Sequence, residues 1–107
     1  MSLDVYLEET QKVDVYRDNI THNLSPMAKE AGIYYHLWRP EEIGITKAGQ
    51  LIDPLKEGLA LLRADEDRFK KLNPPNKWGT YDGLVRFVHD YLVACINNPD
   101  ADVRACR

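Results

Sequence analysis

Hydrophobic and polar residues alternate at the two ends of this chain, whereas the long middle segment repeats its hydrophobic residues every three to four positions. Strict alternation is typical of half-buried strands, and the longer period is typical of amphipathic helices. The alternation covers residues 3–8 and 12–18 and returns at 102–107. A short link joins the first two stretches, which favours an antiparallel hairpin. We therefore predict an α+β fold in which the C-terminal strand completes a small antiparallel sheet.

The alternation also predicts which side chains of the hairpin face the core. Leu3, Val5 and Leu7 lie on one face of the first strand. Val13 and Val15 lie on one face of the second strand, and we expect both to point inward. Successive side chains of a strand point to opposite faces, so the residues between these positions are expected on the outer face of the sheet.

Four segments in the middle of the chain show helical periodicity. They cover residues 24–38, 46–62, 65–72 and 80–95. Pro40 is expected to end the first segment, and Asp53-Pro54 is expected to kink or break the second. The run 73–79 contains two prolines and a glycine, which indicates a loop. Three to four helices are thus expected to cover one face of the sheet.

Size and charge limit the domain count and the class of partner. The 107 residues are enough for one hydrophobic core, so we expect a single domain spanning residues 1–107. The net charge of −3 argues against a nucleic-acid binder or an anionic-membrane binder, which would need a basic surface. No apolar run reaches the ~18 residues that cross a bilayer. The first residues lack the pattern of a signal peptide, so we expect a cytoplasmic protein.

Three short segments collect side chains that can bind a ligand, each where a strand, helix or loop is expected to end. The residues are Asn19, Thr21, His22, Asn23, Trp38, Arg39, Trp78 and Tyr81. A helix N-terminus offers N–H groups to an anion, and an arginine can hold a carboxylate or phosphate with two hydrogen bonds. Each segment also has a structural alternative: helix capping for the first, core packing of Trp38 with an ion pair of Arg39 for the second, and loop packing by Trp78 for the third.

The outer face of the sheet is a second candidate surface. The alternation places Tyr6 and Tyr16 on it, with Arg17 and Arg104 beside them. Aromatic and arginine side chains are enriched in protein interfaces. This favours a protein partner that binds the sheet face or an edge strand, and an edge strand also offers a route to a homodimer. The alternative is an ordinary solvated sheet face.

Spacings that common catalytic and metal sites require are missing from the sequence. The histidines His22, His36 and His89 are not arranged at metal-ligand spacing. Phosphate-binding glycine loops, dinucleotide-binding glycine motifs and nucleophile elbows are also missing. Cys95 and Cys106 are expected to be free thiols. We therefore predict no metal and no cofactor, and we assign no catalytic residue.

Three motifs form a pattern that extends over most of the chain from Asn19 onward. They are Asn-Ile-Thr-His-Asn-Leu at 19–24, Leu-Trp-Arg-Pro-Glu-Glu at 37–42 and Trp-Gly-Thr-Tyr at 78–81. The pattern resembles a family of small uncharacterised proteins of bacteria and their phages. This chain departs from it at Lys77, where the family has glycine, and at Cys106, where it has serine. The resemblance implies no catalytic residue. It implies the setting of a phage or prophage accessory protein that acts on a component of the host cytoplasm.

Three functions are compatible with these observations. The leading hypothesis is a non-enzymatic binding protein with an unidentified protein target, because aromatic, Arg, His and Asn residues gather at element junctions without a catalytic template. The alternative is a protein that binds or sequesters a nucleotide or other small anion. Arg39 and the helix start near Asn23 would hold the charge, and Trp38 or Trp78 would stack on the ligand. The third is a small enzyme that uses His22 as an acid or base near neutral pH.

Overall fold

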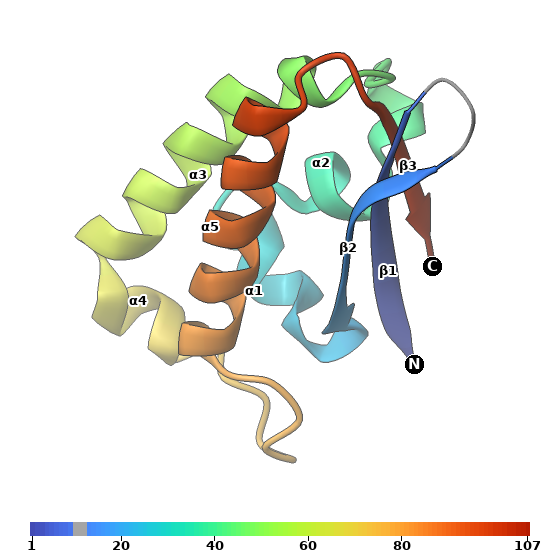
Figure 1. The fold of residues 1–107 in the computed structure, drawn as a ribbon. Coiled ribbons are helices and arrows are strands. Elements are labelled where there is room, and N and C mark those ends of the chain that lie inside the picture. The colour runs from blue at the N-terminus through green and yellow to red at the C-terminus, as the bar shows by residue number, and fades with distance from the viewer. Residues whose placement is uncertain (10–12) are drawn as a thin grey trace.

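The computed structural model describes residues 1–9 and 13–107 and has an α+β fold. Three antiparallel strands, β1 (Ser2–Glu8), β2 (Asp14–Thr21) and β3 (Asp102–Cys106), form one sheet in the order β2-β1-β3. The helices cover one face of this sheet (Figure 1). The predicted fold class is confirmed, including the pairing of the C-terminal strand with the N-terminal hairpin.

The middle of the chain forms five α-helices and three 3₁₀ turns in the described residues. They are η1 (His22–Leu24), α1 (Ser25–Glu30), α2 (Tyr34–Trp38), η2 (Pro40–Ile43), η3 (Ala48–Leu51), α3 (Ile52–Ala64), α4 (Glu66–Lys70) and α5 (Tyr81–Asn97). Among these helices, none combines the length and the apolar character that crossing a bilayer requires.

Two of the predicted helical segments are divided. The first is interrupted at Gly32, whose φ of 78° lies in the left-handed region, so α1 ends and α2 starts as a separate helix. The second begins as the 3₁₀ turn η3 and becomes α-helical only at Ile52. Pro54 then lies in the first turn of α3, where a missing N–H costs little. The N-cap residue of α3 is Leu51, whose side chain makes no capping hydrogen bond.

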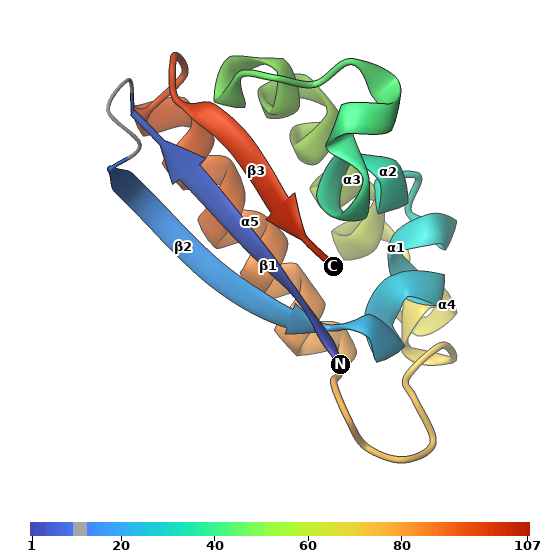
Figure 2. The same ribbon diagram turned by 90° about the vertical axis from the view of Figure 1, so that its right-hand side faces the viewer.

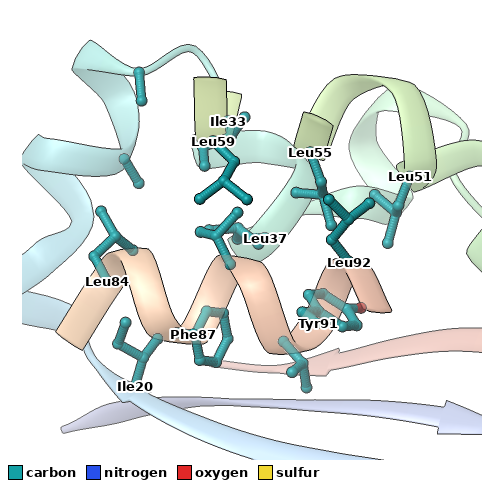
Figure 3. Packing of buried hydrophobic residues seen from close by; sticks show 14 of the residues in the cluster. Ile20, Ile33, Leu37, Leu51, Leu55, Leu59, Leu84, Phe87, Tyr91 and Leu92 are labelled. Carbon is teal, nitrogen blue, oxygen red and sulfur yellow. The ribbon is translucent and has the colours of Figure 1, made fainter. Parts of the chain in front are cut away.

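The core lies between the sheet, α5 and α3. Leu3, Val5 and Leu7 are fully buried, as predicted. Figure 3 shows α5 between the sheet and α3, with Phe87 turned to the side where Ile20 of β2 also lies. Helix α5 is thus the element that both fills the core and lies directly against β2, and these contacts position the groove described below.

The predicted orientation of the second strand is correct for Val15, which is partly buried against the core, and wrong for Val13 and Tyr16. Val13 is 57% exposed, and Tyr16 pairs with Leu7 of β1, so Tyr16 faces the helices and not the outer surface. Its ring stacks on Tyr91 of α5 with 5.8 Å between ring centroids. The reason is a register shift opposite Leu7 and Glu8, because an extra residue in a strand reverses the face of every residue beyond it.

Candidate functional site

A groove of about 600 Å³ lies between strand β2 and helix α5. We call it the β2–α5 groove. Its volume falls within the range of roughly 300–1,000 Å³ that is usual for ligand pockets. Its lining comprises Tyr16, Arg17, Asp18, Asn19, Ile20, Thr21, Leu24, Gly79, Thr80, Gly83, Arg86, Phe87 and Asp90. Figure 1 shows α5 next to β2, and Figure 2 shows it behind the sheet, on the face that the helices cover.

The strand lines this groove with its edge. Six consecutive residues of β2, 16–21, contribute to the lining. A strand that presents one face contributes every second residue, so an unbroken run indicates that the backbone edge is presented. In the described part of the chain β2 pairs with β1 alone, which makes it an edge strand of the sheet.

Hydrogen bonds at the end of β2 show which backbone groups of this strand point away from β1. The N–H of His22 donates to the carbonyl of Met1, on the β1 side, at 3.3 Å. The N–H of Asn19 instead donates to Oδ1 of Asp18, at 2.8 Å. Because backbone direction alternates along an antiparallel strand, the N–H and C=O groups of Arg17, Asn19 and Thr21 point away from β1. They form the edge that borders the groove.

One end of the groove is lined by apolar side chains. Ile20, Leu24 and Phe87 are buried side chains at this end. Gly79 has φ 98°, and a Cβ there would lie 2.7 Å from Cγ2 of Thr21, so only glycine allows this close approach of the loop to β2. The apolar end is therefore built by contacts between the start of α5 and the end of β2.

The other end of the groove carries charge. The hydroxyl of Tyr16 donates to Oδ2 of Asp18 at 3.1 Å. Burial raises the pKa of Tyr16, and the nearby carboxylates of Asp18 and Asp90 raise it further. Arg86 lies 3.9 Å from Asp90 and its side chain is 85% exposed, so it neutralises this carboxylate only weakly.

Two of the predicted polar segments meet, but inside the protein. Nε1 of Trp38 donates to Nδ1 of His22 at 3.3 Å, and Trp38 is 1% exposed. Trp38 also stacks on Tyr34 at 5.6 Å. Arg39 donates to the hydroxyl of Tyr34 at 3.1 Å and pairs with Glu42 at 2.7 Å. These partners support the structural alternative for Trp38 and Arg39.

The first segment divides between capping and the groove. Oγ1 of Thr21 accepts the N–H of Asn23 at 3.3 Å and caps η1, as the structural alternative expected. The side chain of Asn19 donates to Oδ1 of Asp4 at 2.6 Å. Asn19 and Thr21 line the groove, whereas His22 and Asn23 are not part of its lining.

The third predicted segment places its two aromatic residues in different surroundings. Trp78 is 68% exposed on the loop before α5. Tyr81 is buried, and its hydroxyl donates to the carbonyl of Leu62 at 2.6 Å. Burial raises the pKa of Tyr81, with the charge of Glu66 as the next contribution. The two rings do not wall a common pocket, and the segment reaches the groove through Gly79 and Thr80.

On the outer face of the sheet, Tyr6 lies between two arginines. The guanidinium carbon of Arg104 is 3.8 Å from the ring centroid of Tyr6, and that of Arg17 is 5.4 Å away. Arg104 also pairs with Glu8 at 3.2 Å. Tyr16 lies on the opposite face, so the predicted pair of outer tyrosines is not formed.

Sequence reasoning missed the part of the groove that α5 contributes. Gly83, Arg86 and Asp90 recur at helical spacing on one side of α5, next to the apolar stripe that identified the helix. That spacing was visible in the sequence, but nothing local indicated that β2 would lie beside it. Within residues 1–9 and 13–107, no three potential metal ligands come together.

The chain was compared with protein-family models, with curated proteins and with solved structures, and none of the three comparisons gave a match.

Proposed function

We propose that this protein is a non-enzymatic interaction protein that binds an extended segment of a partner protein. The segment would add to β2 as a further strand and lie in the β2–α5 groove. The observation that carries this proposal is the run of consecutive β2 residues along the groove, on a strand whose outer backbone groups point away from β1. In this mode of recognition, main-chain hydrogen bonds supply affinity and the groove's side chains supply specificity.

The two edges of the sheet differ in a way that supports this choice. The start of β3 is occupied, because Val103 donates to the carbonyl of Thr46 at 2.9 Å and Asp102 forms a bridge with Lys47. At β2, by contrast, the N–H of Asn19 is met by the carboxylate of Asp18. Such a side-chain cap discourages indiscriminate strand pairing, and a specific partner can displace it.

The other two hypotheses receive less support from the geometry. A nucleotide or other anion would need Arg39 free and an indole exposed beside it, but Arg39 is engaged by Tyr34 and Glu42 and Trp38 is buried. An acid or base must face a cleft, but Nδ1 of His22 is bonded to Trp38 and Nε2 is buried. The resemblance to bacterial and phage proteins extends our proposal to a host component as the partner.

A peptide-display selection against the purified protein tests strand addition. We expect enriched linear peptides that compete for one site and shift the amide NMR signals of Arg17, Asn19 and Thr21. The decisive variant is Asn19→Pro, which removes the N–H at the groove edge. Its matched control is Asn19→Ala, which loses the same side chain but keeps the N–H.

We expect Asn19→Pro to weaken peptide binding about tenfold relative to Asn19→Ala, since it deletes one main-chain hydrogen bond at the edge. Thermal melts of both variants verify that they fold. Failure to enrich any peptide, or equal binding by the folded Pro and Ala variants, would overturn strand addition at β2.

A further inference from the structure

We infer that the segment bound in the β2–α5 groove carries a basic side chain and an apolar side chain two residues apart. This inference rests on the proposed strand addition and specifies the chemistry of the partner. It comes from the division of the groove into an apolar end and an acidic end, and from the spacing of side chains on a strand.

Gly83 leaves room at the apolar end. A Cβ at Gly83 would make one tight contact, with Oγ1 of Thr80 at 3.3 Å, and would meet no other atom within 4 Å. Gly58 of α3 is different, because a Cβ there would overlap the side chain of Ile33. Ile20 and Phe87 are buried apolar residues of the same groove lining as Gly83. The space next to Gly83 therefore fits an apolar side chain of the bound segment.

The acidic end has an excess of negative charge on the groove side. Asp18 and Asp90 both line the groove, and Oδ2 of Asp18 accepts the Tyr16 hydroxyl at 3.1 Å. Opposing them are Arg86, at 3.9 Å from Asp90, and His89, whose Nδ1 lies 3.1 Å from Asp90. The side chains of Arg86 and His89 are both solvent-exposed, and this exposure weakens their pairing with Asp90.

Arg17 does not change this balance, although it belongs to the groove lining. It pairs with Tyr6 in the sheet register, and its guanidinium lies over the Tyr6 ring on the outer face. The groove side therefore offers a Lys or Arg of the partner two carboxylates. The net charge of −3 of the whole chain favours approach of a basic segment as well.

Strand geometry sets the spacing of the two partner side chains. Asp18 and Ile20 both face the α5 side of the sheet, because they pair with the buried residues Val5 and Leu3. A residue of the added strand shares the face of the β2 residue opposite it. The side chains opposite Asp18 and Ile20 are therefore two residues apart, whichever direction the segment runs.

Three kinds of labelled peptide of about ten residues, the upper end of strand lengths, test this assignment by fluorescence anisotropy. All have a threonine-rich host sequence. The first kind carries Lys-Thr-Val, the second replaces Lys with Glu, and the third moves Lys by one residue. Each kind is made in both sequence orders. We expect the Lys peptide in one of its two orders to bind about tenfold more tightly than the Glu or shifted peptides.

One variant tests the preference for a basic side chain, and another tests the preference for an apolar side chain. Asp90→Asn should reduce the preference for Lys over Glu, measured as the ratio of the dissociation constants of the two peptides. Gly83→Leu should weaken every peptide about tenfold by filling the apolar end. Its matched control is Ala60→Leu, which adds the same side chain to an exposed helical position far from the groove lining. Circular dichroism verifies folding of all three.

The outcomes separate this inference from the function on which it rests. If display-selected peptides are sensitive to Asn19→Pro but show no basic-to-apolar spacing, strand addition stands and the assigned chemistry is overturned. Equal binding of the three peptides, or no binding of any of them, overturns the assigned chemistry too. If the protein is a dimer and Asn19→Pro dissociates it, the groove binds a second copy of this chain. That result would also overturn the assigned chemistry of the partner.

Discussion

Lys77 is a single residue that adopts a conformation usually left to glycine. Its φ of 62° lies in the left-handed region, where a Cβ crowds the neighbouring carbonyl. The conformation orients Trp78 and Gly79, which follow it directly, so the loop geometry is maintained here at an energetic cost.

Replacing Lys77 with glycine should therefore stabilise the protein. We expect a gain of about 0.5–1 kcal/mol in the free energy of unfolding, which is the left-handed strain less the added chain entropy of glycine. Urea denaturation measures it. Lys77→Ala is the control, because alanine retains the Cβ and should give no gain. Equal stability of the two variants would contradict the strain argument.

His36 gives the protein a pH-dependent stability. Burial lowers the pKa of His36 below 6.5, because the charged ring is poorly solvated, and its Nδ1 has no hydrogen-bond partner among the described residues. The unfolded chain then binds a proton more readily than the folded chain, so stability decreases as pH falls below 6.5.

We expect the difference in unfolding free energy between wild type and His36→Asn to change as pH falls below 6.5, since the variant cannot take up this proton. Urea denaturation from neutral to mildly acidic pH measures it. The same substitution at exposed His89 is the comparison. A constant difference between wild type and His36→Asn over this range would contradict the effect of burial.

At the scale of elements, the periodicity of the sequence predicted the strands and the four helical regions, but not every boundary. The break at Gly32 depends on one left-handed residue inside a regular apolar repeat. The face of β2 depends on one extra residue opposite Leu7 and Glu8. Periodicity averages over many residues, so it does not detect a single residue that ends a helix or shifts a strand.

Gly58 shows how packing between elements can reverse a helix preference. In an exposed helix, replacing glycine with alanine stabilises by about 1 kcal/mol. At Gly58 the new methyl group would overlap Ile33, so we expect Gly58→Ala to destabilise by about 1–3 kcal/mol. Thermal or urea denaturation measures the change.

The control for Gly58 lies two residues further along α3. Ala60 is exposed, and Ala60→Gly should cost about 1 kcal/mol through helix propensity alone. If Gly58→Ala stabilises the protein instead, α3 does not approach Ile33 as closely as the structure places it.

For the whole molecule, the sheet depends on contacts between the two ends of the chain. The strand β3 pairs with the central strand β1, and Arg107 donates to the carbonyl of Trp38 at 2.9 Å and to Glu41 at 2.7 Å. A two-stranded hairpin is marginal in water, and removal of β3 would turn β1 into an exposed edge.

Deletion of residues 102–107 should therefore prevent stable folding or cause aggregation. Circular dichroism and size-exclusion chromatography measure these outcomes. Deletion of Arg107 alone is the control, and we expect it to cost about 1 kcal/mol or less because its partners are partly solvated. A truncated chain that stays monomeric with an unchanged melting temperature would show that β3 is dispensable.

The order of local patterns along the chain was sufficient to predict the α+β class, the buried face of β1 and the loop before α5. Those features follow from which residues avoid water, and a short stretch of sequence records that directly. The β2–α5 groove, the contact of His22 with Trp38 and the inward orientation of Tyr16 arise from contacts between segments distant in sequence. Local periodicity indicates that a side chain is buried, whereas long-range packing determines which partner it meets.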